Sequence, residues 1–224
     1  MPLSSLKAAP RNRGQTRLKH DAILDAATVV FLNGGYAQAS MDAIALEAGV
    51  SKATVYSHFG GKEALFGAII EAQCRELMSP LLITDLREGN PEDTLRAVAD
   101  RFMELVMSET ALALYRVVMA EAPRFPLLAQ AFYENGPARA ITSLAAYLSE
   151  QADLGRLGIS DPATAAEQFF SLLTGYLHVR TVLGIAPSPG APDLSQHIAD
   201  TVDIFLRACG HRAGAARAGP GQSA

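Results

Sequence analysis

Apolar residues recur at helical spacing along most of the chain. In the first such segment, which begins at residue 17, they fall at i, i+3, i+4, i+7 and i+8 and therefore share one face of a helix. These residues are Ile23, Ala26, Ala27, Val30 and Phe31. The sequence Asn33-Gly34-Gly35 predicts the end of this helix, because glycine accepts the left-handed backbone of a helix end. No segment alternates apolar and polar residues, so the pattern predicts an all-α protein.

The same spacing predicts a series of further helices toward the C-terminus. They cover residues 62–78, 92–108, 110–122, 126–152, 162–184 and 193–209. Gly136-Pro137 predicts a kink within the fourth of these segments, because proline removes a backbone donor. Residues 1–16 and 210–224 show little periodicity, which predicts a flexible basic arm and a disordered tail.

The segment from Ser40 to Phe59 predicts two short helices joined by a tight turn at Gly49. Ser40 and Ser51 are suited to cap the two helices, since serine oxygens accept hydrogen bonds from the free amides of a first turn. Glycine suits the turn because it tolerates backbone angles that other residues avoid. Such a short helix, turn and short helix has the spacing of a DNA-binding helix-turn-helix.

The outward face of the second short helix carries small, polar and basic side chains. They are Lys52, Ala53, Thr54, Tyr56 and His58. Lysine and threonine reach base edges or phosphates, whereas tyrosine and histidine suit phosphate oxygens. Lys62 adds a positive charge at the start of the next helix, where free backbone amides favour anions. The alternative is a polar surface helix in an unrelated helical bundle.

Charge is distributed unevenly along the 224 residues, whose formal net charge is −4. Residues 1–62 hold seven basic and four acidic side chains, a net charge of +3, whereas the remainder holds twelve basic and nineteen acidic ones, a net charge of −7. A positive first segment on an acidic body is typical of a protein that presents one end to phosphates. The hydrophobic fraction of 49% indicates a sizeable core.

Several other protein classes are not indicated. No apolar run reaches the length of a membrane span, and the N-terminus lacks the apolar core of a signal peptide, so we expect a cytoplasmic protein without a membrane partner. Cys74 and Cys209 form neither a disulfide framework nor a zinc motif, and we expect two reduced thiols; a redox-sensing role for either stays open. No nucleophile elbow, phosphate loop or metal-ligand spacing indicates an enzyme, a cofactor or a metal.

Residues 23–66 resemble the N-terminal domain of the TetR/AcrR transcriptional regulators. The segments that carry the resemblance are ILDAATVVFLNGGYAQAS, MDAIALEAGVSKATVYSHF and GGKEALF. Farther along, YRVVMAEAPRFPLLAQAFYENGPARAI resembles the ligand-binding half of an AefR-like branch of that family. Gly60-Gly61 departs from the proline- or serine-containing link of many members. The resemblance implies an arm at 1–16, a DNA-binding domain at 17–62, a ligand-binding and dimerisation domain at 63–209 and a tail at 210–224.

The resemblance also implies an all-helical, Ω-shaped homodimer that places one recognition helix of each subunit in a major groove of a palindromic operator. Lys52, Ala53 and Thr54 take the base-facing positions after the cap Ser51, and the phosphate-contacting positions are Ser40, Tyr56, His58 and Lys62. Val50, Val55 and Phe59 are expected in the core. The basic residues Arg11, Arg13, Arg17 and Lys19 either follow the minor groove or a flanking phosphate, or form a solvated leader.

The last two predicted helices, 162–184 and 193–209, are expected to form the dimer interface. Their apolar stripes are Phe169, Leu172, Leu173, Tyr176 and Leu177 on one helix and Leu194, Ile198, Val202, Phe205 and Cys209 on the other. Candidate walls of an effector pocket are Phe102, Met103, Val106, Met107, Tyr115, Met119, Phe132, Tyr133, Phe170, Tyr176 and His178. Methionine and aromatic side chains adapt to varied apolar ligands, although the same residues also build ordinary helical cores.

The leading hypothesis is a ligand-responsive repressor. An apolar or aromatic effector would shift the helix at 62–78 and favour a DNA-incompetent state, so that effector and operator bind antagonistically. The alternative is a DNA-binding regulator without small-molecule input, controlled by a protein partner or by thiol oxidation.

Overall fold

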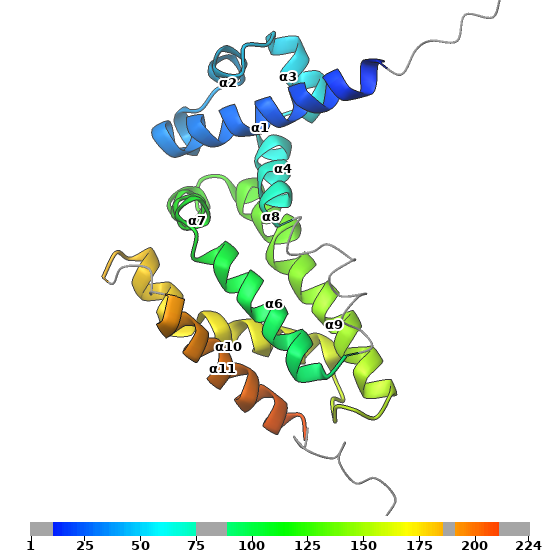
Figure 1. Cartoon of the computed structure of the whole chain (residues 1–224). Helices are drawn as coiled ribbons and strands as arrows, with labels where there is room; N and C mark the ends of the chain where they lie inside the picture. Colours follow the sequence, from blue (N-terminus) through cyan, green and yellow to red (C-terminus); the bar gives the residue numbers. More distant parts are fainter. Residues whose placement is uncertain (1–10, 75–88, 186–190, 211–224) are drawn as a thin grey trace, which may run out of the picture. The chain divides into compact units, whose positions relative to one another are not determined.

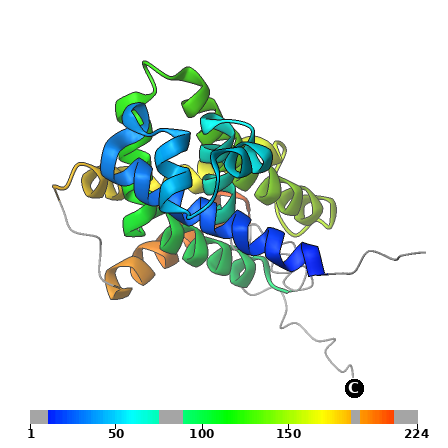
Figure 2. The same ribbon diagram turned by 90° about the horizontal axis from the view of Figure 1, so that it is seen from above.

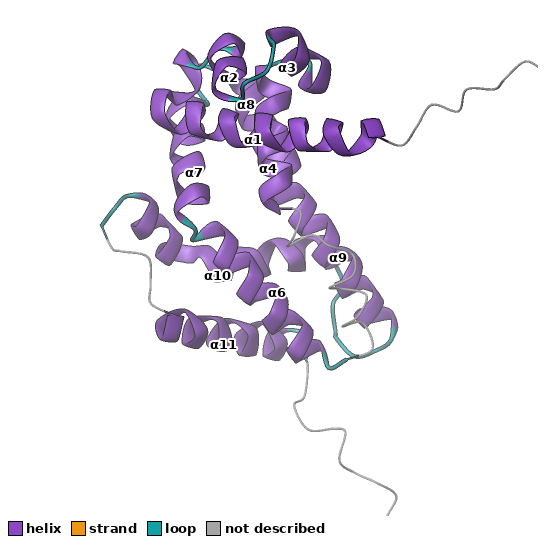
Figure 3. Cartoon of the chain, turned by 45° about the horizontal axis from the view of Figure 1, so that its top comes forward, coloured by secondary structure: helices purple, strands orange, loops and turns teal. Residues whose placement is uncertain are grey.

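The computed structural model describes residues 11–74, 89–185 and 191–210. Figure 3 shows helices and loops throughout these residues and no strand, which confirms the predicted all-α class. The chain divides into two compact units. We call residues 1–71 together with 116–132 the head unit, and residues 72–115 together with 133–224 the body unit. The segment 116–132 therefore groups with the head, although the expected domain boundary lies after residue 62.

The head unit begins with four helices, labelled in Figure 1: α1 (Arg11–Gln38), α2 (Met41–Glu47), α3 (Lys52–Phe59) and α4 (Lys62–Cys74). Helix α1 starts at Arg11, within the segment expected to be a flexible arm, and its backbone leaves the helical range at Gly35, where φ is 72°. The head core gathers the inward side chains of all four helices. Its fully buried members are Ile23, Ala27, Phe31, Tyr36, Ile44, Val55, Leu65 and Phe66.

The remaining helices are α6 (Pro91–Val106), α7 (Glu109–Glu121), α8 (Pro126–Asn135), α9 (Pro137–Asp153), α10 (Pro162–Val182) and α11 (Ala191–Ala208). Helices α7 and α8 each contribute residues to both units, because the segment 116–132 takes the end of α7 and most of α8. The body core consists of apolar residues from α6, α9, α10 and α11. Its largest fully buried side chains are Leu95, Met103, Tyr147 and Phe169.

Two of the predicted helices are interrupted, one at the predicted kink and one at a glycine that was not expected to break its helix. The helix expected at 126–152 is two helices, because Gly136 has φ −116° and ψ −94° directly before Pro137. Helix α10 contains a second, unpredicted break at Gly175, where φ is 39° and ψ is −146°. The expected end of the helix at 62–78, the first part of the arm and most of the C-terminal tail lie outside the described residues.

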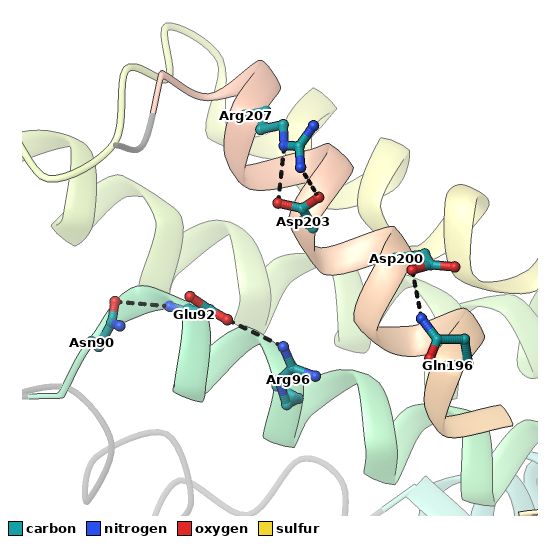
Figure 4. A network of polar contacts seen from close by, with 7 residues as sticks. All are labelled: Asn90, Glu92, Arg96, Gln196, Asp200, Asp203 and Arg207. Carbon is teal, nitrogen blue, oxygen red and sulfur yellow. Dashed lines mark hydrogen bonds and ion pairs between the residues drawn. The ribbon is translucent and has the colours of Figure 1, made fainter. Parts of the chain in front are cut away.

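Local capping explains where the body helices begin. Asp161 accepts hydrogen bonds from the amides of Ala163 and Thr164 at the start of α10. The hydrogen bond from the Thr164 hydroxyl, and then that from the Thr164 amide, lower the pKa of its carboxyl group. Asn90 accepts from the amide of Glu92 in the same way at α6. Figure 4 shows this cap and, on the outer surfaces of α6 and α11, polar pairs four residues apart such as Arg96 with Glu92.

Candidate nucleic-acid interface and effector site

Helices α2 and α3 form the predicted helix-turn-helix. Ser40 accepts a hydrogen bond from the amide of Ala43, and Ser51 accepts one from the amide of Thr54, each at 3.1 Å. Gly49, with φ 63°, makes the turn between them in a backbone conformation that side chains disfavour. Ile44, Ala45 and Val55 are buried, whereas Val50 and Phe59, also expected in the core, are only half-buried.

The predicted DNA contacts on and beside α3 differ in exposure. Ser40, Ser51, Lys52, Ala53 and Tyr56 are exposed, and Thr54 and His58 are half-buried. The Thr54 hydroxyl lies 2.8 Å from the Ser51 hydroxyl, which orients it at the start of α3. The exposed side chains at the start of α3 are thus small or basic.

Lys52 is exposed but not alone. Its ammonium group donates to Asp42 Oδ2 of α2 over 2.8 Å, and this hydrogen bond, with the charge of the carboxylate, raises the pKa of Lys52. Both side chains remain more than half exposed to solvent. Water and salt therefore weaken the pair, so a phosphate or a base edge can compete for the lysine.

Lys62 occupies a different environment from the one expected for a phosphate contact. Its ammonium group donates to the backbone carbonyls of Tyr36 (2.8 Å) and Ala39 (3.0 Å) and lies 4.3 Å from the centre of the Tyr36 ring. Burial lowers the pKa of Lys62. Two of its three N–H groups thus hold the end of α1 and the link to α2, and a phosphate would have to use the third.

Lys62 belongs to a partly buried aromatic joint that the sequence did not predict. The joint consists of Tyr36, the ring of Phe125 at 5.2 Å from it, the Lys62 ammonium and the carboxylate of Glu121, which accepts from the amide of Ala37 at 3.4 Å. Burial first, and the nearby Glu63 carboxylate second, raise the pKa of Tyr36. Glu121 and Phe125 come from the segment 116–132, about 90 residues along the chain, and no local motif signals such a pairing.

His58 packs beside a second histidine. The ring of His20, on α1, lies 6.1 Å from that of His58 and 4.9 Å from that of Phe59, between ring centres. The Nδ1 atom of His20 is 3.2 Å from a carboxylate oxygen of Asp21. These contacts join the N-terminal half of α1 to the end of α3.

In the body unit, the structure brings together two pairs of the predicted effector residues. Phe102 and Phe170 lie 4.4 Å apart between ring centres, and His178 meets the edge of Tyr115 at 4.9 Å. Burial lowers the pKa of His178, which favours a neutral imidazole. Met103 and Met107 are buried in the core of the body unit.

Other predicted effector residues do not line the interior of the body unit. Tyr176 is 85% exposed and Tyr133 is 53% exposed, because each projects from the outer side of its helix. Met119, at 59% exposed, and the half-buried Phe132 belong to the head unit. Sequence spacing alone did not distinguish the inner face from the outer face of these helices.

Helix α10 carries both buried and exposed apolar side chains. Phe169 and Leu173 are buried in the core of the body unit. Leu172 before the break at Gly175, and Tyr176, Val179 and Leu183 after it, are exposed. The predicted stripe of α10 is therefore divided between core and surface, whereas that of α11 packs inward.

Two further properties bear on the excluded classes. Among the described residues no helix is long and apolar enough to cross a membrane, and no group of three metal-ligating side chains occurs there. Cys209 is buried, and burial raises the pKa of its thiol, which disfavours the reactive thiolate. Cys74 is the last residue of α4, and its side chain lies outside the described part.

Comparison with known families gives two matches that together cover most of the chain. Residues 23–69 match the family described as bacterial regulatory proteins, tetR family. Residues 93–211, more than half of the chain, match the AefR-like transcriptional repressor C-terminal domain. The first match contains the complete helix-turn-helix, and the second runs from the first turn of α6 through α11.

Individual relatives agree with these matches. A TetR-family regulator from Mesorhizobium loti has a similar structure, with a TM-score of 0.75 and 31% identity, over 87% of this chain and 98% of that one. The flavonoid-responsive regulator FrrA is similar with a TM-score of 0.71 and 39% identity, over 86% and 97%. The transcriptional activator FasR of Mycolicibacterium smegmatis is 34% identical over 104 residues, which cover 45% of this chain and about half, 48%, of FasR.

Proposed function

Because the chain belongs to the TetR family of transcriptional regulators, we propose that it is a repressor that a small apolar or aromatic effector releases from a palindromic operator. Like its relatives, it is a DNA-binding regulator and not an enzyme. The observation that carries the proposal is the surface of α3. This helix is capped at its N-terminus by Ser51 and exposes Lys52, Ala53 and Tyr56 to solvent. The operator lies on the chromosome, so the proposed place of action is the cytoplasm.

In the proposed complex, α3 enters the major groove. Lys52, Ala53 and Thr54 face base edges, while Ser40, Ser51, Tyr56 and His58 contact the phosphate backbone. Their exposure supports these roles, except that His58 and Thr54 are half-buried and reach the DNA with part of their surface. We assign Lys62 to supporting the helix-turn-helix and not to the phosphates, because two of its N–H groups donate to the carbonyls of Tyr36 and Ala39.

The proposed partner of the subunit is a second copy of this chain. A palindromic operator requires two recognition helices about 34–36 Å apart, which a two-fold symmetric dimer provides. The exposed apolar side chains Leu172, Tyr176, Val179 and Leu183, in α10 and directly after it, support this proposal, since large apolar side chains left in water are typical of an interaction surface. Replacing both Tyr176 and Val179 by Glu should yield a monomer in multi-angle light scattering.

The proposed effector is an aromatic or apolar molecule bound in the body unit. FrrA, which is similar over 86% of this chain and 97% of its own, is a flavonoid-responsive regulator, and the neighbouring rings of Phe102 and Phe170 suit an aromatic ligand. Tyr115 and the neutral His178 add polar atoms able to orient a hydroxyl or a carbonyl group.

Helix α7 is the proposed connection between effector and operator. It carries Tyr115, which contacts His178 in the body unit, and six residues later Glu121, which contacts Ala37 in the head unit. One continuous helix transmits a displacement of its first half to its second half, so binding at Tyr115 biases the position of the joint. Effector and operator then bind antagonistically by linkage.

The test is a mobility shift with the DNA upstream of the protein's own gene, in the presence and absence of flavonoids. The proposal expects saturable binding by a dimer and its release by an aromatic compound. Absence of saturable binding at moderate salt contradicts DNA recognition. Binding that persists across a broad aromatic library, with no thermal stabilisation of the free protein, supports the alternative of a regulator without small-molecule input.

A further inference from the structure

The positive charge of the head unit does not lie on its helix-turn-helix. Residues 40–62 contain two lysines and two acidic residues and are neutral overall. Residues 1–19 contain five basic residues and no acidic one. The N-terminal part of the head therefore carries the excess charge, while the predicted reading surface is balanced.

The two lysines of the helix-turn-helix are also engaged by the protein itself. Lys52 donates to Asp42, and Lys62 donates to the carbonyls of Tyr36 and Ala39. A phosphate that approaches Lys52 also approaches the Asp42 carboxylate, which repels it. The helix-turn-helix thus offers little net attraction to DNA of arbitrary sequence.

Two exposed cations of α1 lie within one helical turn of His20, the residue of α1 that contacts the end of α3. Arg17 and Lys19 are exposed, and no described residue forms an ion pair with either. Arg17 precedes His20 by one helical turn, and His20 packs on Phe59 and His58 at the end of α3. Figures 1 and 2 show the start of α1, in dark blue, extending past α3 as a helix. A helix holds these charges in a defined direction, which a flexible arm would not.

We propose that the exposed basic surface of α1 formed by Arg17 and Lys19 binds the DNA phosphates that flank each half-site and supplies the sequence-independent part of the affinity. The inference rests on the proposed DNA-binding function. It assigns different tasks to two regions of the head: α1 holds the DNA backbone, and the neutral face of α3 distinguishes sequences. The partner chemistry is the phosphate backbone, not base edges in the minor groove.

The experiment is a salt titration of DNA binding by the full-length protein, with the double variant Arg17→Gln/Lys19→Gln. Each neutralised phosphate contributes about 0.9 to the slope of log K against log salt. The proposal expects the slope to fall by about two per subunit, and the affinity to fall at least about tenfold for operator and unrelated DNA alike. The variant Arg96→Gln/Arg101→Gln, which removes the same charge from α6, should keep the wild-type slope.

Three outcomes overturn the inference. They are an unchanged slope, an equal loss in the α6 control, and a loss confined to particular base pairs, which would indicate minor-groove reading. The variant Arg17→Lys/Lys19→Arg, which keeps both charges, should retain the slope and so separates charge from any change in folding. If wild-type protein does not bind DNA even at low salt, the proposed function fails, whereas wild-type binding with an unaffected variant refutes this inference alone.

Discussion

Helices α3 and α4 each begin with a lysine, and the two lysines show how differently one small unit can use the same side chain. Lys52 stays in water beside Asp42, and their ion pair raises its pKa. Lys62 is partly buried over the Tyr36 ring between two carbonyls, and burial lowers its pKa. Lys52 can therefore bind an external partner at little cost in free energy, whereas Lys62 stabilises the fold of the head unit.

The contrast extends to the surroundings of each lysine. The surface at Lys52 is built by residues close in sequence, from Ser40 to His58, and changes there should alter DNA binding with little effect on folding. The joint at Lys62 combines α1, α4 and the segment 116–132, all within the head unit, so changes there should alter the folding of that unit.

The largest effect is expected for Tyr36→Ala. This change removes a fully buried ring that contacts Phe31, Phe66 and Phe125, and large-to-small changes of this kind cost about 3–5 kcal/mol. Urea unfolding should therefore show a strong decrease in the free energy of unfolding. Tyr56→Ala is the matched control, because Tyr56 is 45% exposed and should lose DNA affinity with almost unchanged stability. Equal stability of the two variants would remove the distinction between joint and surface.

The second-largest effect, again a loss of stability, is expected for Lys62→Met. The substitution keeps the aliphatic stem and leaves two carbonyl groups without their charged donor, which costs about 1–2 kcal/mol at a partly exposed site. Thermal unfolding should shift downward, while the salt slope of DNA binding at a temperature where the variant is folded should stay unchanged. A slope reduced by about 0.9 per subunit with undiminished stability would instead establish Lys62 as a phosphate contact.

A smaller effect is expected for Asp42→Asn, which sharpens the description of Lys52. Removing the carboxylate frees the ammonium group and removes a negative charge near the phosphates, so affinity for unrelated DNA should rise about two- to fivefold. Fluorescence anisotropy with operator and scrambled DNA measures the change. A loss of operator affinity alone would mean that Asp42 orients Lys52 for base contact instead of competing for it.

The smallest effect is expected for the dependence of stability on pH through His178. Burial lowers the pKa of its imidazole. Because the folded pKa lies below the unfolded value of about 6.5, this group contributes stability that is present above pH 6.5 and is lost as the pH falls through the folded pKa. Between pH 7.5 and 5, wild-type protein should lose more free energy of unfolding than His178→Phe. Identical pH profiles would show that His178 is as accessible to protons as in the unfolded chain.

Local chemistry explains why the helix-turn-helix could be predicted from the sequence. The caps Ser40 and Ser51 and the turn at Gly49 lie within a dozen residues, and each favours the same backbone as the apolar pattern around it. The all-α class and the start of α10 at Pro162 follow from equally local signals.

The features that could not be predicted from the sequence depend on contacts between residues far apart in the chain. The pairing of Tyr36 with Phe125 links residues 89 positions apart, and no spacing rule predicts it. Periodicity placed Tyr176 on one apolar stripe with Phe169 and Leu173, but α10 breaks at Gly175, and Tyr176 directly after the break is exposed whereas Phe169 and Leu173 are buried. The hydrogen bonds of Lys62 to the carbonyls of Tyr36 and Ala39 likewise join residues more than twenty positions apart, and no local pattern predicts them.

The central claim is that α3 reads DNA sequence through Lys52 and its neighbours. The most direct measurement compares wild-type protein and Lys52→Gln on the DNA upstream of the protein's own gene and on a scrambled version of that DNA, at one salt concentration. The account predicts that wild-type protein prefers its own upstream DNA at least about a thousandfold, and that Lys52→Gln loses much of this preference. Equal binding of both DNAs by wild-type protein, or an undiminished preference in Lys52→Gln, would contradict it.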